Sequence, residues 1–308
     1  MNRYDAIVIG GGPAGITAAL YLLRFQVKVA VVEKLAPGGQ VLRTHLVENY
    51  PGFPQPVEGW KLADIFAEHL KPYHYDTYND EVSRIEVGKE MHRLKIGDTW
   101  VEARTIIVCT GAVYKELGLP GEKELSGKGV SYCATCDGNF FRDQVVAVIG
   151  GGNTALEESL YLARLVKKLY LLHRRDDFRG HKCFQNRCEV NPVITIRRST
   201  LAKRILGDDK VTGIEIENIK TGEKEHLSVD GVFVFVGYDP HGDFYPPEIQ
   251  LDERGFIITD AEMRTSVPGI FAAGDIRSKL CRQITTAVGD GATAANAAHA
   301  YMEEKGFI

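Results

Sequence analysis

Apolar and polar positions alternate along the chain in an order that occurs twice. Residues 5–10 form a short apolar run that ends in glycine, as a buried strand does. A glycine-rich turn follows, and then apolar side chains recur at helical spacing from Ile16 to Leu23. A second apolar run, residues 28–32, ends at Glu33. This order predicts a strand, a helix and a second strand parallel to the first.

The same order returns at residue 145. Residues 145–150 predict a strand, Leu156 and Leu160 lie on one face of a predicted helix, and residues 168–172 predict another strand. Two such units predict an α/β protein with two Rossmann-like dinucleotide-binding domains, each a parallel sheet covered by helices.

The rest of the chain adds further predicted elements. A helix is expected near residues 60–70, and an alanine-rich closing helix at 287–304. Further strands are expected at 105–109, 193–198, 211–217, 231–236 and 269–275, the last ending in a tight turn.

Composition narrows the class of protein. The chain has 308 residues, of which 44% are hydrophobic and 25% charged, so we expect a globular protein of two domains. The net charge of −4 gives no basic excess that would bind nucleic acid or an anionic membrane. No apolar run approaches the roughly 20 residues of a membrane span, and the first residues lack the features of a signal peptide. Six cysteines are too few for a disulfide scaffold. We therefore expect a cytoplasmic protein in which a disulfide would be catalytic.

The first glycine-rich turn carries a dinucleotide-binding motif. Gly10, Gly12 and Gly15 match G-x-G-x-x-G between the first predicted strand and helix. In this motif the first glycine permits a tight turn, the second lets the backbone approach a pyrophosphate, and the third lets the helix pack against the strand. Glu33 ends the second strand, where a carboxylate accepts hydrogen bonds from ribose hydroxyls. The pattern predicts an FAD or NAD site.

The second turn repeats the motif with a different charge beside it. Gly150 and Gly152 match the fingerprint, and Ala155 takes the third position, which the pattern allows. The following strand ends in His173-Arg174-Arg175, with Arg179 close behind, and contains no acid there. Guanidinium groups bind a ribose 2′-phosphate, so this site is expected to prefer NADPH to NADH. The alternative is a solvated surface cluster.

Cys133 and Cys136 form a Cys-x-x-Cys pair, followed directly by Asp137. Two thiols at this spacing form a disulfide reversibly, and a neighbouring carboxyl can exchange the protons that disulfide exchange requires. The alternative is half of a zinc site, but the only other close cysteines, Cys183 and Cys188, have a different spacing, so no metal is expected. A flavin accepts a hydride from a nicotinamide and passes two electrons to a dithiol, so it is the natural intermediary between the two nucleotide sites and this pair.

Taken in order, these motifs resemble a known family. The series is Gly10-Gly11-Gly12-Pro13-Ala14-Gly15, Gly38-Gly39-Gln40, Glu48-Asn49-Tyr50-Pro51-Gly52, Cys133-Ala134-Thr135-Cys136-Asp137-Gly138, Gly150-Gly151-Gly152-Asn153-Thr154-Ala155, His173-Arg174-Arg175, Gly274-Asp275 and Arg282-Gln283. Over essentially its whole length the chain resembles the low-molecular-weight thioredoxin reductases, the NADPH-dependent FAD flavoproteins of class II of the pyridine nucleotide-disulfide oxidoreductases.

The resemblance implies a domain arrangement and two sets of binding residues. Residues 1–113 and 240–308 would form a discontinuous FAD-binding domain, and residues 114–239 an inserted NADPH-binding domain that carries the Cys-x-x-Cys pair. The FAD contacts would be Gly10, Gly12, Pro13, Ala14, Gly15, Glu33, Gly39, Gln40, Asn49, Gly274, Asp275, Arg282, Gln283 and Ile284. The NADPH contacts would be Gly150, Gly152, Asn153, Thr154, His173, Arg174, Arg175 and Arg179.

The resemblance also implies roles and partners. Cys136 would face the flavin, Cys133 would attack the disulfide of thioredoxin or a thioredoxin- or glutaredoxin-like protein, and Asp137 would supply the proton. A homodimer is expected. The sequence departs from the family's pattern at residues 180–188, which places the edge of the NADPH domain and the partner surface in question. Residues 237–240 are a variant of the family's loop.

Three other functions compete with this interpretation. A dithiol oxidase would pass electrons from thiols to oxygen and needs no NADPH site, so the second motif argues against it. A peroxiredoxin-linked reductase usually carries an additional N-terminal redox domain, and this sequence starts at the FAD strand. A nucleotide sensor without turnover would not need the dithiol.

Overall fold

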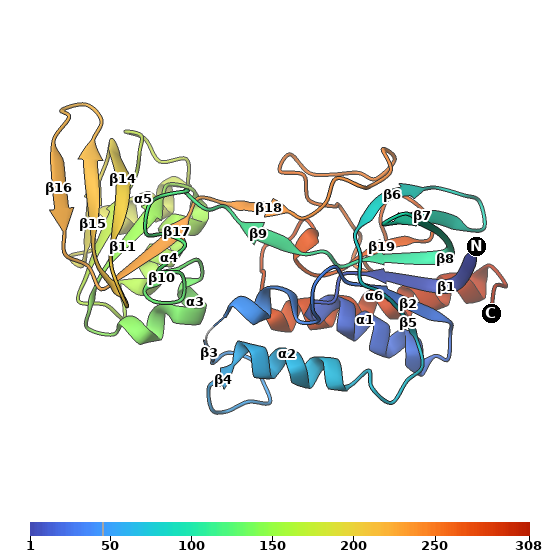
Figure 1. Ribbon diagram of the computed structural model, residues 1–308. Coiled ribbons are helices and arrows are strands. Elements are labelled where there is room, and N and C mark those ends of the chain that lie inside the picture. Colours follow the sequence, from blue (N-terminus) through green and yellow to red (C-terminus); the bar gives the residue numbers. More distant parts are fainter. Residues whose placement is uncertain (45) are drawn as a thin grey trace. The chain divides into compact units, whose positions relative to one another are not determined.

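The computed structural model describes residues 1–44 and 46–308. The chain divides into two compact units: unit 1 is residues 1–113 and 239–308, and unit 2 is residues 114–238. The expected α/β fold, with the second unit inserted into the first, is confirmed, and the second boundary lies one residue before the expected position. The chain passes between the units at two strands, β9 (Ala112–Tyr114) and β18 (Tyr238–Pro240), which pair as a two-stranded sheet (Figure 1).

Unit 1 is built on a seven-stranded sheet in the order β5-β2-β1-β8-β7-β6, with β19 paired to β8. Its strands are β1 (Asn2–Ile9), β2 (Val29–Val32), β5 (Asp76–Tyr78), β6 (Val82–Glu86), β7 (His92–Ile96), β8 (Thr99–Val108) and β19 (Ile270–Ala272). The strand β1 is parallel to β2 and β8, as the strand–helix–strand order predicts. The antiparallel meander β6-β7-β8 was not predicted.

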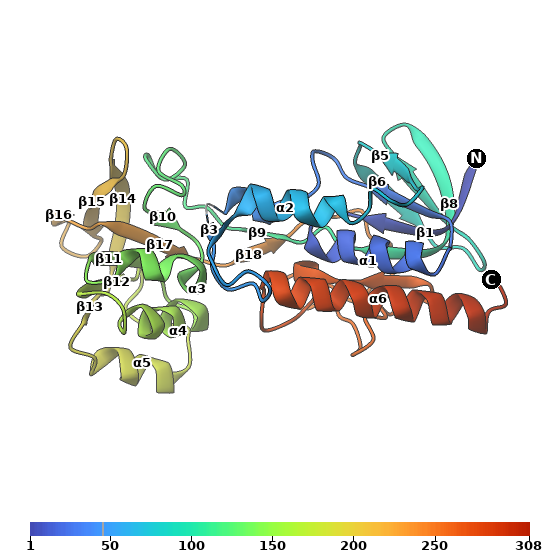
Figure 2. The ribbon, with the colours of Figure 1, turned by 90° about the horizontal axis from the view of Figure 1, so that it is seen from below.

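Helices α1 (Pro13–Arg24), α2 (Gly59–Glu68) and α6 (Ile284–Glu304) lie side by side on one face of this sheet (Figure 2). Proline in the first turn and the alanine- and leucine-rich interior favour α1. Small residues let α6 approach α1 closely, since a Cβ at Gly291 would lie 2.2 Å from the carbonyl oxygen of Ala14. The shorter elements are η1 (Gly39–Arg43), β3 (Leu46–Val47), β4 (Val57–Glu58) and η3 (Gly274–Ile276).

Unit 2 contains the second strand–helix–strand motif in a five-stranded parallel sheet, in the order β10-β17-β11-β12-β13. The strands are β10 (Val130–Ser131), β11 (Val145–Gly150), β12 (Lys168–Leu172), β13 (Ile194–Arg197) and β17 (Gly231–Phe235). The helices are α3 (Ala134–Asp137), η2 (Gly138–Phe141), α4 (Asn153–Leu162) and α5 (Lys182–Glu189). A separate antiparallel sheet joins β14 (Thr200–Gly207), β15 (Val211–Asn218) and β16 (Lys224–Leu227).

Each unit has its own hydrophobic core on both faces of its main sheet. In unit 1 one core lies between the sheet and helices α1 and α6, and another on the opposite face. In unit 2 one core packs against α4, and the other fills the space between the parallel and antiparallel sheets. Within the described parts of the chain, no helix is both long enough and apolar enough to cross a membrane.

Candidate functional site

The glycine turn after β1 has the geometry of a dinucleotide-binding loop. Gly10 has a φ of +106°, and a Cβ there would lie 2.5 Å from the carbonyl oxygen of Cys109. A Cβ at Gly15 would lie 1.8 Å from the carbonyl oxygen of Gly10, so the helix can start this close to the strand only with glycine there. The space around Gly12 is open, with the Cα of Gly39 as nearest atom at 3.9 Å. The turn therefore leaves room for a pyrophosphate at the start of α1.

Glu33 also lies at this turn, at the end of β2. Its Oε2 accepts from the N–H of Gly11 at 2.7 Å, and its Oε1 accepts from the N–H of Leu35 at 2.9 Å. These bonds fix the carboxylate beside the loop, and each oxygen keeps a lone pair for a ribose hydroxyl.

Two buried acceptors in unit 1 lack hydrogen-bond partners among the described residues. Besides the hydroxyl oxygen of Thr110, they are the amide Oε1 of Gln40 and the carboxylate Oδ1 of Asp275. Burial raises the pKa of Asp275 to about 6, although Lys279 and Arg282 act in the opposite direction. Buried polar atoms are normally paired, so these two indicate a missing ligand that carries donor groups, as the hydroxyls of FAD do.

The residues before α6 form a connected loop. The guanidinium group of Arg282 donates to the carbonyl oxygens of Asp275, Arg277 and Lys279 and stacks on a phenylalanine ring. Gln283 is the N-cap residue of α6 and accepts from Nδ2 of Asn49 at 3.0 Å.

The hydrogen bonds of Arg282 and Gln283 fix the conformation of the loop that carries several of the predicted FAD contacts. Ile284, the first residue of α6, packs against the small cluster around Val41 and Leu62.

Asp290 was missed by the sequence analysis. Its Oδ2 accepts from the N–H of Gly274 at 3.0 Å and forms ion pairs with Lys279 at 2.8 Å and Arg277 at 3.0 Å. The three side chains are only 11–13% exposed. This carboxylate therefore ties the turn of Gly274 and Asp275 to α6. Its isolated negative charge inside a helix of small neutral residues was the available signal.

The second glycine turn resembles the first in its packing. A Cβ at Gly150 would lie 2.6 Å from the Cβ of Ala155, whereas the space around Gly152 is open. The carbonyl oxygen of Gly151 accepts from the N–H groups of Arg179 and Gly180. The chain after β12 is thereby held against the glycine turn.

Arg174, Arg175 and Arg179 are exposed at the end of β12. Within residues 1–44 and 46–308 their guanidinium groups form no ion pair. Three unpaired cations beside an open glycine turn fit a ribose 2′-phosphate. Thr154, in the first turn of α4, lies on the exposed side of the same helix end.

His173 and Asn153 are predicted NADPH contacts that the structure places in supporting positions. The ring of His173 is 6% exposed, packs against Gly151 and bonds the carbonyl oxygen of Asp177, and its burial lowers the pKa. Oδ1 of Asn153 accepts from the N–H of His181 at 2.7 Å. Through these contacts, both side chains stabilise the segment after β12 that carries the three arginines.

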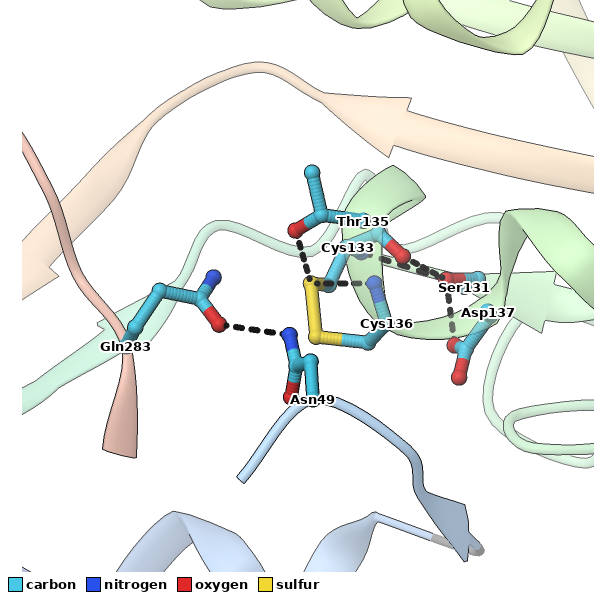
Figure 3. The surroundings of a disulfide bond; sticks show 7 residues. All are labelled: Asn49, Ser131, Cys133, Thr135, Cys136, Asp137 and Gln283. Atoms are coloured by element: carbon cyan, nitrogen blue, oxygen red, sulfur yellow. Dashed lines mark hydrogen bonds between the residues drawn. A yellow bond between two sulfur atoms is a disulfide. The ribbon is translucent and has the colours of Figure 1, made fainter. Parts of the chain in front are cut away.

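Cys133 and Cys136 are joined by a disulfide with Cα atoms 5.3 Å apart (Figure 3). Cys133 follows β10 and caps α3, where its Sγ accepts from the N–H of Cys136 at 3.2 Å. The Oγ1 of Thr135 lies 3.5 Å from the same sulfur. The predicted pair is therefore in its oxidised form, with both sulfurs held by one short helix.

Ser131, also missed by the sequence analysis, links this pair to Asp137. Its Oγ donates to Oδ2 of Asp137 at 2.6 Å and accepts from the N–H of Cys133 at 3.1 Å (Figure 3). A lone serine two residues before a cysteine carries no signal in the sequence.

The other cysteines are separate from this pair. Cys183 is exposed, whereas Cys188 is buried and its thiol bonds the carbonyl oxygen of Leu156, so α5 holds no second redox pair in this structure. Cys109 is buried, and burial raises the pKa of its thiol well above its usual range, as expected for an inert core residue.

Comparisons with known proteins agree with this arrangement. Residues 4–291 match the family model of the pyridine nucleotide-disulphide oxidoreductases. The chain is 42% identical to a thioredoxin reductase of Treponema pallidum over 300 residues, which is 97% of each chain. It is 41% identical to that of Bacillus subtilis over 302 residues, 98% of this chain and 95% of the relative.

A solved structure is similar over the same length. The crystal structure of the thioredoxin reductase from Streptococcus pyogenes aligns with a TM-score of 0.93 and 45% identity, covering 98% of this chain and 99% of the other. The resemblance drawn from the motifs is confirmed. The chain belongs to the pyridine nucleotide-disulphide oxidoreductase family, among the relatives named thioredoxin reductase.

Proposed function

We propose that this protein is an NADPH-dependent flavoprotein that reduces the disulfide of thioredoxin or of a similar small redox protein. The observation that carries the proposal is the closed Cys133–Cys136 disulfide beside Asp137, in a chain with two open dinucleotide-binding turns. Full-length relatives carry the name thioredoxin reductase, which supports the choice of acceptor.

Unit 1 holds FAD and unit 2 holds NADPH in this proposal. The turn at Gly12, the carboxylate of Glu33 and the unpaired oxygens of Gln40 and Asp275 support the first assignment. The arginines at the end of β12 support the second. When bound, FAD supplies a carrier that takes a hydride from the nicotinamide and returns two electrons to a disulfide.

The dithiol then reduces the acceptor by two exchange steps. The thiolate of Cys133 attacks one sulfur of the acceptor disulfide, and the other acceptor sulfur leaves and is protonated. Cys136 next attacks Cys133, which restores the Cys133–Cys136 disulfide and releases the second acceptor sulfur. The enzyme loses two electrons and the acceptor gains two. Asp137 is the proton donor in this proposal.

Single cysteine variants test the route. Cys136→Ser is expected to retain bound FAD and its bleaching by NADPH, yet lose NADPH-dependent reduction of thioredoxin, because no disulfide can form within the enzyme. The matched control is Cys183→Ser, which removes an exposed thiol of the same unit. Disulfide turnover by the Cys136→Ser protein would refute the proposed route.

The alternative is a dithiol oxidase, or a reductase of another acceptor, with the same fold. Anaerobic assays separate these functions, because an oxidase stops without oxygen and a reductase continues with NADPH. Activity with thioredoxin, with a glutaredoxin-like protein and with small disulfides distinguishes the acceptors.

A homodimer and a cytoplasmic location complete the proposal. The homodimer derives from the family resemblance, and the cytoplasmic location from the small number of cysteines. Light scattering after size-exclusion chromatography, with an expected mass of twice 34.1 kDa for the polypeptide, tests the dimer.

A further inference from the structure

We propose that Ser131 is a positioning residue of the dithiol centre, which orients the carboxyl group of Asp137 and anchors Cys133 during disulfide exchange. The inference rests on the proposed reduction of a protein disulfide by Cys133 and Cys136, and it adds a residue to that reaction.

The hydrogen-bond distances decide what the Ser131 hydroxyl does. Its Oγ is 2.6 Å from Oδ2 of Asp137 and 3.3 Å from the carbonyl oxygen of Cys133. A separation of about 2.6 Å is typical of a hydroxyl that donates to a carboxylate, so the proton points to Asp137. The same oxygen accepts from the N–H of Cys133 at 3.1 Å. One buried hydroxyl therefore contacts both the acid and the attacking cysteine.

The position of Ser131 in the fold explains why this contact is rigid. Ser131 is 4% exposed and lies in β10, opposite Phe233 of the neighbouring strand β17. Asp137 ends the four-residue helix α3, which is too short to be stable alone. The hydrogen bond ties the end of this helix to the main sheet of unit 2.

The proton balance of the exchange gives Asp137 two transfers. In the reactive state Cys133 is a thiolate, Cys136 is a thiol and Asp137 holds the proton lost by Cys133. The first acceptor sulfur leaves as a thiolate and takes that proton. Asp137 then takes the proton of Cys136, and the second acceptor sulfur receives it as the Cys133–Cys136 bond closes.

The consequence is a specific effect on the pH profile. A hydrogen bond donated to a carboxylate favours its charged form, so removing the donor lets Asp137 keep its proton to higher pH. In Ser131→Ala, the descending limb of the pH–rate profile for exchange is expected to shift to higher pH by about one to two units, as the loss of one hydrogen bond to a charged group implies.

The measurement isolates exchange from the reaction with NADPH. FAD-loaded enzyme is reduced with dithiothreitol, desalted and mixed without NADPH with oxidised thioredoxin or with a small aromatic disulfide, between about pH 6 and pH 9.5. Ser131→Thr keeps the hydroxyl and is expected to restore the wild-type profile. Ser159→Ala is the matched control, since that buried hydroxyl donates at 2.6 Å to the carbonyl oxygen of Ala155, away from the dithiol.

A double variant separates positioning from a structural effect. In an Asp137→Asn background, Ser131→Ala is expected to cause no further change in the pH profile. A rate lowered equally at every pH, or a shift that persists without Asp137, would overturn the role of Ser131. Failure of the reduced wild-type enzyme to react with either disulfide would overturn the proposed function as well.

Discussion

At the scale of single residues, we propose that the three exposed arginines at the end of β12 select NADPH over NADH. The Arg174→Ala/Arg175→Ala variant is expected to raise KM for NADPH by roughly a hundredfold or more, since each of the two lost charged hydrogen bonds costs about 1.5–3 kcal/mol. The KM for NADH is expected to change little. Steady-state kinetics with both nucleotides checks this, with Arg204→Ala, an exposed arginine on β14, as control. Equal effects on both nucleotides would rule out recognition of the 2′-phosphate.

Asp275 is expected to destabilise the protein in the absence of FAD. Its pKa in the folded protein is about 6, above the ordinary 3.8, because the carboxyl group is buried. The folded state therefore binds the proton more tightly, so this group contributes most stability below pH 4 and loses that contribution as pH rises through 6.

Asp275→Asn is expected to make the FAD-free protein more stable at pH 7, by up to about 3 kcal/mol, with little difference from wild type at pH 4. FAD affinity, followed by flavin fluorescence, is expected to fall because an acceptor oxygen is lost. Urea unfolding of FAD-free protein across this pH range is the test. Equal stability of both proteins at pH 7 would show that the buried carboxylate does not lower the free energy of unfolding.

The predictability of the site differs among these residues for a physical reason. The glycine turns and the Cys133–Cys136 pair are local, so a fixed spacing in sequence reports their geometry. Asp290 contacts Gly274 and Lys279, which lie 16 and 11 residues earlier in the sequence, so no local spacing reports these contacts. Ser131 acts through a hydroxyl group whose direction depends on the fold. His173 follows the fingerprint by position, yet its ring is buried against the turn.

At the scale of elements, Asp290 couples α6 to the turn after β19. Asp290→Ala is expected to lower the free energy of unfolding by about 2–4 kcal/mol, because Arg277 and Lys279 stay largely buried without their counter-ion. Urea denaturation measures this. The control is Glu68→Ala, which removes an exposed ion pair with Lys71 and should cost less than about 1 kcal/mol. Similar losses in both variants would contradict the structural role of Asp290.

The elements that the sequence predicted are those with strong burial. The strands β1, β2, β11 and β12 are mostly or wholly buried, so they appear as continuous apolar runs. The strands β6 and β16 lie at sheet edges and carry consecutive exposed polar or charged residues, so their pattern resembles that of a loop. The helix α5 is polar along most of its length, and its formation depends on the packing of Cys188 and Gln185.

At the scale of the whole molecule, the chain is two units with separate cores, one inserted into the other. Length and the repeated motif predicted two domains, but the discontinuous arrangement came only from the family resemblance. The return of the chain to unit 1 depends on pairing between β19 and β8, strands more than 150 residues apart in sequence. No local pattern reports such a pairing.

We propose that NADPH, and not NADH, delivers electrons to this chain through FAD. The most direct test is to mix the purified, FAD-loaded protein with each nucleotide in the absence of oxygen and follow the flavin absorbance. We expect rapid bleaching with NADPH, followed by recovery of the colour when oxidised thioredoxin is added, and much slower bleaching with NADH. Failure of NADPH to bleach the flavin would contradict the account and would leave the arginines of unit 2 without the proposed role.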